Sequence, residues 1–275
     1  MPQPPTILAL ETSTERLSLA IMQGERVWVR EVNAGQRHSE LAMVELAALF
    51  AQANCTLADM DAIAFGQGPG SFVGVRIACG LAQGLALGAG KRLIAVPTQL
   101  ALAEQALLVP PGVKSEAARV LVAIDARMGE FYVAAYELDQ TEVDHSNQAD
   151  QKNQADASGW RVVVAPMLAR ADQLPAIAGD GLFGIGSAFD VPALRAQLLA
   201  RYAGKISRVL ENRLPSASDV GRIASRQWAK LGTAATITPE LAAPLYLRNH
   251  VAMTIVERQA SKALQKQTEQ AKAVA

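Results

Sequence analysis

Two acidic residues at the ends of apolar segments are the first candidates for chemistry. Glu11 and Asp125 each follow at least four consecutive apolar residues. Paired carboxylates at strand ends hold Mg²⁺ and activate water in phosphoryl-transfer folds. Neither acid is followed by the glycine-rich phosphate turn of an active ATPase: Thr12-Ser13-Thr14 offers hydroxyls, and Ala126-Arg127-Met128 offers almost nothing. The two acids therefore indicate the layout of a phosphoryl-transfer protein without its phosphate loop.

A glycine-rich loop, Gly66-Gln67-Gly68-Pro69-Gly70-Ser71, stands directly before a predicted helix. Exposed amides at a helix start can hold a phosphate. The loop is not a P-loop, because neither Gly-Lys-Ser nor Gly-Lys-Thr follows it. One interpretation is a tight structural turn with Ser71 as the helix N-cap. The other is a nucleotide or anion site formed by Glu11, Thr12, Ser13, Gly70 and Ser71.

The histidines and cysteines do not form a recognisable catalytic or metal-binding pattern. His38, His145 and His250 are scattered, without the spacing of a zinc motif. His38 precedes a helix and is better explained as a cap or a hydrogen-bond partner than as a ligand. Cys79 lies among apolar residues of a helix, which is typical of a buried, inert thiol. We predict no metal site and no catalytic residue.

Hydrophobic periodicity predicts an α/β protein. In the first half, the expected strands are 6–10, 17–22, 26–32, 61–65 and 92–96, and the expected helices are 39–52, 71–87 and 98–108. In the second half, the expected strands are 119–124, 131–138 and 160–165, and the expected helices are 191–202 and 216–231. In both halves an acid ends a strand and the next strand begins six positions later. This pattern suggests an internal duplication.

The order of the predicted elements also predicts how the chain is divided into lobes. Residues 1–108 would form a first lobe, completed by the helix at 216–232. Residues 109–215 would form a second lobe, interrupted by a polar insert at 140–158 that is rich in Gln, Asn and Asp. An extended segment would follow at 233–256, and a flexible tail at 257–275.

Two of the predicted helices are apolar on more than one side. In the helix at 71–87, Val73, Ile77, Gly80 and Gly84 share one face, while Ala78, Leu81, Ala82 and Leu85 lie opposite. In the helix at 39–52, Leu41, Val44 and Ala48 face away from Met43, Leu46 and Leu49. Each interior glycine costs about 1 kcal/mol relative to alanine, and a second packed side would offset that cost. We interpret Leu41, Val44, Ala48, Val73, Ile77, Gly80 and Gly84 as a partner interface. The alternative is that the chain's own sheet and helices bury both sides.

Composition narrows the classes of function. The chain has 275 residues, of which half are hydrophobic, with 26 basic and 26 acidic side chains. A domain that binds nucleic acid alone usually carries a basic excess, so zero net charge argues against that role. No signal peptide is readable, and no uninterrupted apolar stretch reaches the roughly 18 to 20 residues of a membrane span. Two cysteines without paired spacing fit a reduced, cytoplasmic setting.

Five segments together resemble the bacterial TsaB (YeaZ-type) family of tRNA threonylcarbamoyladenosine biosynthesis proteins. They are ILALETS at 7–13, HSE at 38–40, GPGSFVGVR at 68–76, DARMGE at 125–130 and PLYLR at 244–248. The resemblance implies a duplicated actin-like, sugar-kinase-like fold. Val73 stands where the family usually has threonine, which removes a hydroxyl beside the glycine loop. The family's catalytic paralogue carries a metal-binding histidine pair. The corresponding residues of this chain, 97–104, contain no histidine, so the metal site cannot be transferred to it.

The resemblance also implies a role. Such a chain would be a non-catalytic subunit needed to place threonylcarbamoyl on the adenosine beside the anticodon of ANN-reading tRNAs. Its partners would be a TsaD-type catalytic paralogue and a small TsaE-type ATPase, with a homodimer when it is alone. The complex would use ATP and Mg²⁺. This chain would contact tRNA only indirectly, through the complex, and no membrane would be involved.

Two other functions compete with this one. An active small-molecule kinase or ATPase of the same fold would turn over ATP in a Mg²⁺-dependent way that Glu11→Ala or Asp125→Ala abolishes. A metallopeptidase would need bound metal, and the histidine arrangement speaks against it.

Overall fold

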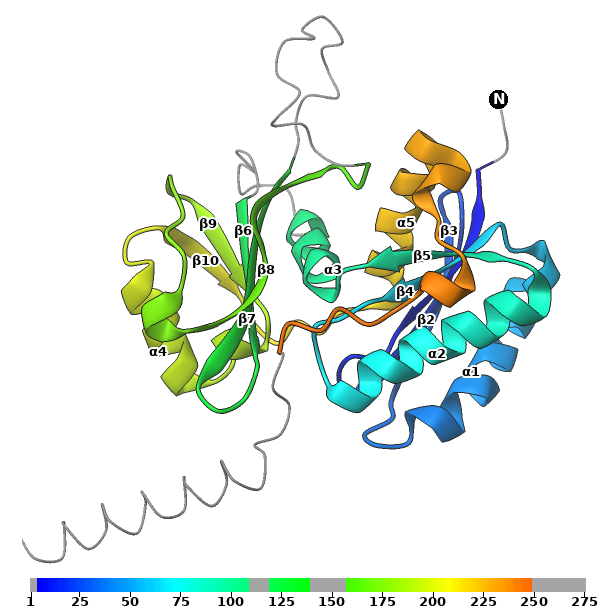
Figure 1. The fold of residues 1–275 in the computed structure, drawn as a ribbon, viewed down its shortest axis with the longest axis horizontal. Coiled ribbons are helices and arrows are strands. Elements are labelled where there is room, and N and C mark those ends of the chain that lie inside the picture. The colour runs from blue at the N-terminus through cyan, green and yellow to red at the C-terminus, as the bar shows by residue number, and fades with distance from the viewer. Residues whose placement is uncertain (1–3, 109–118, 139–156, 249–275) are drawn as a thin grey trace, which may run out of the picture. The chain divides into compact units, whose positions relative to one another are not determined.

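The computed structural model describes residues 4–108, 119–138 and 157–248 (Figure 1). Residues up to Leu245 form one compact unit, and Tyr246–Ala275 forms another, of which three residues are described. Most of the predicted polar insert, His145, His250 and the predicted tail therefore lie outside the described residues. The elements below belong to the first unit.

The first half of the chain builds a five-stranded sheet of order β3-β2-β1-β4-β5. Its strands are β1 (Thr6–Glu11), β2 (Arg16–Gln23), β3 (Arg26–Asn33), β4 (Ala62–Gly66) and β5 (Arg92–Val96). The central strand β1 is antiparallel to β2 and parallel to β4, with Leu8 opposite Ile21 and Ile63. All six residues of β1 are buried, as expected of a strand covered on both faces.

Helices cover both faces of this first sheet (Figure 1). On one face, α1 (His38–Ala53) packs on β2 and β3, while α2 (Phe72–Ala89) packs on β1, β4 and β5. On the other face lies α5 (Ala217–Leu231), which follows the second sheet in sequence but packs on β1, β2 and β4. The short η1 (Leu57–Asp59) links α1 to β4.

The second sheet repeats the topology of the first. Its order is β10-β9-β6-β7-β8, so the central strand β6 is antiparallel to β7 on one side and parallel to β9 on the other. The strands are β6 (Arg119–Asp125), β7 (Glu130–Leu138), β8 (Trp160–Arg170), β9 (Leu182–Ile185) and β10 (Ile206–Leu210), with α4 (Pro192–Arg201), η4 (Ala171–Gln173) and η5 (Ser187–Phe189) between them. The predicted duplication and actin-like fold class are confirmed.

Three features of the second sheet differ from the prediction. The strand predicted at 160–165 continues to Arg170 past Pro166, because β8 is an edge strand, where a missing backbone N–H is tolerated. Strands β9 and β10 were not predicted. The first has four residues and contains Gly184, and the second contains exposed Ser207 and Arg208, so neither shows a clear apolar period.

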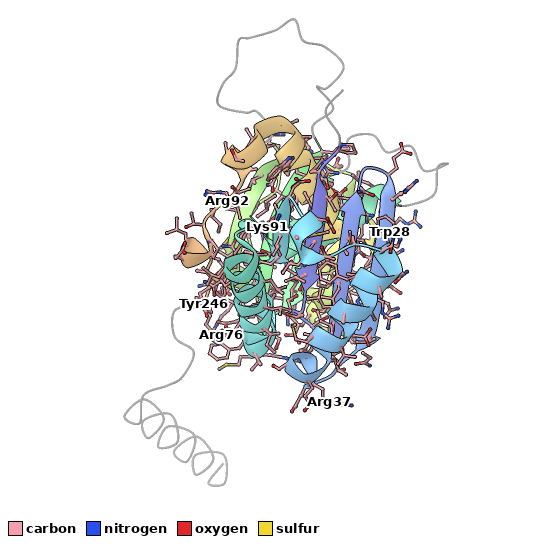
Figure 2. The ribbon with its side chains drawn as sticks, turned by 90° about the vertical axis from the view of Figure 1, so that its right-hand side faces the viewer. Trp28, Arg37, Arg76, Lys91, Arg92 and Tyr246 are labelled. Carbon is pink, nitrogen blue, oxygen red and sulfur yellow. The ribbon has the colours of Figure 1, made fainter. Side chains whose placement is uncertain are left out.

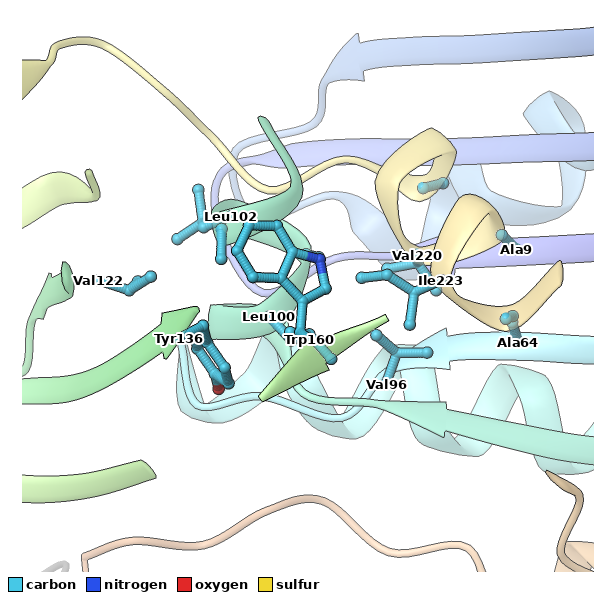
Figure 3. Close-up of a cluster of buried hydrophobic side chains, with 14 of the residues drawn as sticks. Ala9, Ala64, Val96, Leu100, Leu102, Val122, Tyr136, Trp160, Val220 and Ile223 are labelled. Atoms are coloured by element: carbon cyan, nitrogen blue, oxygen red, sulfur yellow. The ribbon is translucent and has the colours of Figure 1, made fainter. Parts of the chain in front are cut away.

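One of the buried apolar clusters contains residues of both sheets. The helix α3 (Thr98–Glu104) and its 3₁₀ continuation η2 (Gln105–Leu108) lie there, next to α5. The Trp160 indole, fully buried, packs among side chains of α3, α5 and both sheets (Figure 3). Its Nε1 donates to Glu104 Oε2 at 2.9 Å, and Arg226 donates to both oxygens of Glu104 at 2.8 and 2.6 Å. Buried charges need such partners, and these contacts join α3, α5 and β8.

The segment after α5 crosses the first lobe as a strap, which we define as residues 232–245. It contains η6 (Gly232–Ala235) and η7 (Pro239–Leu241). Ile237 and Leu93 exchange backbone hydrogen bonds of 2.8 and 2.9 Å, which closes the outer edge of β5. At its end, Leu245 N donates to Gln67 O at 2.8 Å. The extended segment predicted from residue 233 is thus interrupted by short 3₁₀ turns.

Candidate functional site

The five residues predicted to hold an anion come together where β1 ends and α2 begins. We call them the junction cluster: Glu11, Thr12, Ser13, Gly70 and Ser71. Most of its polar groups bond to one another or to neighbouring backbone: Thr12 Oγ1 donates to Gly74 O at 2.8 Å, and Ser71 N donates to Ser13 O at 2.8 Å. Ser71 Oγ accepts from Gly74 N at 3.4 Å, which confirms Ser71 as the N-cap of α2. Ser13 Oγ is buried with no hydrogen-bond partner among the described residues.

The carboxyl group of Glu11 is the buried centre of this cluster. Ser13 N donates to its Oε1 at 2.6 Å, and Thr98 Oγ1 donates to its Oε2 at 3.0 Å. Thr98 Oγ1 in turn accepts from Gly68 N at 3.1 Å, so the carboxyl group and the glycine loop are tied to the start of α3. Burial raises the pKa of Glu11 above its usual value, although hydrogen bonds from the Ser13 backbone N–H and the Thr98 hydroxyl oppose the shift.

Two glycines allow this close packing. A Cβ atom at Gly66 would overlap Oε2 of Glu11 and lie 2.7 Å from its Cδ. A Cβ atom at Gly74 would overlap the carbonyl oxygen of Thr12. The cluster therefore has the contacts of a structural joint between β1, the glycine loop and α2. Its capacity to bind an anion stays a prediction.

The equivalent position in the second lobe is built differently. Asp125 ends β6 as Glu11 ends β1, but its oxygens accept from Arg127 N at 2.7 Å and Arg127 Nη1 at 3.0 Å. Arg127, Met128 and Gly129 all have positive φ, and the Arg127 and Met128 side chains are exposed. Asp125 thus organises its own loop, and Glu11 is engaged within the first lobe.

The histidine and cysteine predictions have different outcomes. His38 is the first residue of α1 and is buried, but the N-cap position is Arg37 and makes no side-chain cap bond. The Nε2 of His38 has no hydrogen-bond partner in the described part of the chain, so the predicted capping role is wrong. Cys79 is buried as predicted, and burial raises the pKa of its thiol, which disfavours the thiolate. Within residues 4–108, 119–138 and 157–248, no three His, Cys, Asp or Glu side chains are grouped to hold a metal ion.

The outer surface of α1 and α2 is apolar and exposed. We call it the α1–α2 face. Figure 2 shows the two helices side by side on the near side of the first sheet. Val44 is 64% exposed and Val73 is 62% exposed, and Met43, Phe72 and Leu87 are also exposed. A Cβ atom at Gly80, Gly84 or Gly88 would meet nothing within 4 Å, so the crest of α2 is bare backbone. The inner sides of the same helices carry the core residues Leu46, Leu49, Ala78 and Ala82.

The seven predicted interface residues lie on or beside this face. Val44, Val73, Gly80 and Gly84 are exposed, while Leu41, Ala48 and Ile77 are half-buried. Met43, which the helical pattern placed with the core residues Leu46 and Leu49, is exposed instead. Met43 therefore belongs to the α1–α2 face and not to the core. Partner binding at these residues stays a prediction.

The charged groups of the two helices are engaged locally. Glu40 pairs with Arg37 at 2.8 Å, and Glu45 pairs with Arg30 at 2.6 Å. The single charged residue of α2, Arg76, stacks on the ring of Phe72 with 3.3 Å between the guanidinium carbon and the ring centroid. The α1–α2 face therefore has few charged residues among its exposed apolar side chains. This is the composition found at the core of protein–protein interfaces.

The apolar sequence of α2 is interrupted by Arg76 and Gln83. Among the described residues, α2 is one helix that is long and apolar enough to cross a membrane, by length and composition only. The core helix of a soluble protein passes the same test. Here the inner side of α2 packs on the sheet, and interior glycines form its outer side.

The geometry defines a two-lobed, actin-like chain with an exposed helical face, and comparison with known proteins places it in a family. A family model described as "TsaD: tRNA N6-adenosine threonylcarbamoyltransferase" matches residues 31–256. The TsaB protein of Escherichia coli K12, a "tRNA threonylcarbamoyladenosine biosynthesis protein", is 33% identical over 90% of this chain and 96% of its own. The TsaB protein of Haemophilus influenzae is 29% identical over 90% of this chain and 94% of its own.

Solved structures agree with the sequence relatives. A Pseudomonas aeruginosa protein described as similar to peptidase YEAZ superposes with a TM-score of 0.72 at 30% identity, over 89% of this chain and all of that one. A structure of YeaZ from the same organism gives a TM-score of 0.70 at 29% identity, over 88% of this chain and all of that one. The chain belongs to the TsaB (YeaZ-type) family.

The site also contains residues that the sequence did not reveal. Thr98 was expected only to begin a helix, yet its hydroxyl bonds to Glu11, 87 positions earlier. Gln83 of α2 also forms contacts that a helical pattern does not predict, because its Nε2 donates to Pro239 O at 2.9 Å and to Ala242 O at 3.1 Å of the strap. A polar side chain alone among apolar helix positions was the available signal for Gln83.

Proposed function

We propose that this chain is a non-catalytic partner subunit of a complex that forms threonylcarbamoyladenosine in tRNA. The α1–α2 face supports this proposal most strongly, because it is apolar and exposed, and its charged residues are engaged locally. Exposed apolar surface of this kind marks protein–protein contact sites. Relatives that align over nearly their full length are named for biosynthesis of this nucleoside.

The proposed partner on this face is the TsaD-type catalytic paralogue. When that paralogue is absent, a second copy of this chain would occupy the same face. A small TsaE-type ATPase would join the complex and use ATP with Mg²⁺. The complex would act in the cytoplasm, and tRNA would contact this chain only through the complex, in keeping with its zero net charge.

The contacts of Glu11 and Asp125 favour a subunit over a catalyst. The Glu11 carboxyl group accepts from Ser13 and Thr98, and the Asp125 carboxylate accepts from Arg127. Both acids therefore have structural tasks in their own lobes. A kinase or ATPase is the competing function, and it requires ATP turnover by this chain alone.

The deciding experiment is a reconstitution with and without this chain. The mixture contains tRNA, ATP, threonylcarbamoyl-adenylate generated in situ, the catalytic paralogue and the small ATPase. The modified nucleoside is quantified by mass spectrometry. We expect modification only when this chain is present, and none from this chain alone. Full modification without it would reject the proposal and return the function to the kinase alternative.

The location of the interface is tested by Gly84→Leu. Because a Cβ atom at Gly84 meets nothing within 4 Å, the isolated chain has room for the larger side chain. We expect the variant to fold and to lose association with the paralogue. A folded variant with unchanged association would show that the face is not the interface.

A further inference from the structure

The strap carries an exposed apolar side chain next to the α1–α2 face. Leu241, in η7, is 71% exposed. The turn that presents it is fixed, because Leu241 N donates to Thr238 O at 3.0 Å and Ala242 N donates to Pro239 O at 3.2 Å. Exposing a leucine side chain forgoes about 1.5 to 3 kcal/mol of burial free energy. A fixed, exposed leucine is therefore a candidate contact residue.

Gln83 attaches this turn to α2. Its side-chain amide donates to two strap carbonyls, those of Pro239 and Ala242, on either side of Leu241. Along α2, Gly80 and Leu87 lie about one turn before and after Gln83, and both are exposed. The strap thus borders the outer stripe of α2 at mid-helix.

Three elements consequently lie side by side on one surface. In Figure 2, α2 lies between α1 and the strap turn, which is drawn in orange. The flanks of this surface carry Val44 from α1 and Leu241 from the strap, and its centre is the bare backbone at Gly80 and Gly84. A helix of a partner can approach such a glycine crest closely and contact apolar side chains on both flanks.

We propose that the strap is a third element of the partner interface, with Leu241 as a contact residue and Gln83 as the residue that positions it. This inference rests on the proposed function. The occupant is a helix of the catalytic paralogue, because Gln83 attaches the strap to α2, and the proposed function assigns that paralogue to the face that α2 forms.

The test measures association of the full chain with the purified paralogue by titration calorimetry. Leu241→Asp places a charge at the contact and leaves the carbonyls bound by Gln83 in place. We expect it to weaken association about tenfold or more. The matched control is Leu231→Asp, at a half-exposed leucine that ends α5 on the opposite face of the sheet. We expect the control to bind as the unaltered chain does.

The positioning role of Gln83 has a separate readout. Gln83→Glu replaces the donor by an acceptor facing two carbonyl oxygens, so the strap should detach. We expect faster hydrogen exchange at the Ile237 and Leu245 amides, together with weaker paralogue binding. Gln83→Lys keeps a hydrogen-bond donor at this position, so we expect amide exchange and paralogue binding close to those of the unaltered chain. Unchanged exchange in Gln83→Glu would overturn the positioning role.

The outcomes separate this inference from the proposed function. If Gly84→Leu loses the paralogue and Leu241→Asp keeps it, the strap inference fails and the α1–α2 face stands. If neither variant loses the paralogue, both the face and the strap inference fail. If Leu241→Asp impairs only self-association, measured by sedimentation of the chain alone, the occupant is a second copy and the inference is overturned.

Discussion

Gly66 and Glu11 are packed so closely that the first must lack a side chain for the second to be buried. A Cβ atom at Gly66 would lie 2.7 Å from Cδ of Glu11 and overlap its Oε2. The backbone of β4 therefore forms one wall of the carboxyl site. We expect Gly66→Ala to displace the carboxyl group and to cost about 1 to 3 kcal/mol of unfolding free energy, as overpacking does. Urea denaturation measures this, and an unchanged midpoint would show that the site adapts.

Two different physical reasons explain the glycines of α2, and a matched pair of substitutions distinguishes them. A Cβ atom at Gly74 would overlap the Thr12 carbonyl oxygen, whereas one at Gly80 meets nothing within 4 Å. We expect Gly74→Ala to destabilise the isolated chain. Gly80→Ala should stabilise it by up to about 1 kcal/mol through helix propensity. Thermal unfolding of the two variants checks the signs, and equal shifts would contradict this assignment.

The buried Glu11 makes stability depend on pH in a defined direction. Its pKa is raised from the usual 4.5 by burial, so between pH 4.5 and the higher native pKa the folded chain holds a proton that the unfolded chain has lost. The stability that this proton contributes is fully present below pH 4.5 and is lost as the pH rises through the native pKa. Glu11→Gln does not titrate.

We therefore expect wild type to lose stability relative to Glu11→Gln as the pH rises from 4 to 8. The melting temperatures of both proteins across that range measure the difference. Asp219, whose pKa burial also raises, is present in both proteins and cancels. A difference that does not change with pH would show that Glu11 titrates normally.

The carboxylate of Glu104 should be far more important than a surface acid. It is 2% exposed and accepts two bonds from Arg226 and one from Trp160. Removing one member of a buried pair leaves an uncompensated charge and costs about 3 kcal/mol, reduced here because Arg226 is partly exposed. We expect Glu104→Gln to lower the urea midpoint strongly. Glu40→Gln, in an exposed pair with Arg37, should change it by less than about 1 kcal/mol.

The sequence predicted those parts of the fold that depend on local pattern. Strand β5 was predicted with its observed bounds, and α1 and α2 to within about two residues, because their apolar periods and caps are local. The contact between Thr98 and Glu11 joins residues 87 positions apart, and the attachment of the strap to Gln83 joins still more distant ones. Such pairings depend on where the chain returns in space, which periodicity does not encode.

The candidate interface could be predicted only in part, because some of its residues are brought together by contacts between distant segments. Glycines at Gly80 and Gly84 are costly inside a helix, so their presence signalled a special surface. The sequence could not show that Met43 is exposed, nor that the strap residue Leu241 lies beside α2. Both facts depend on where other elements of the fold lie, which the local sequence pattern does not encode.

Because α5 comes late in the sequence but packs on the first sheet, the first lobe can complete its fold only late in synthesis. All five strands of the first sheet have been synthesised once Val96 is added, yet α5, which covers one face of that sheet, ends only at Leu231. The free edge of β5 waits longer still, until Ile237 arrives. The lobe that is synthesised first is therefore the last to complete its fold. Until α5 has been made, the sheet face that α5 covers stays exposed, and a chaperone would have to shield it.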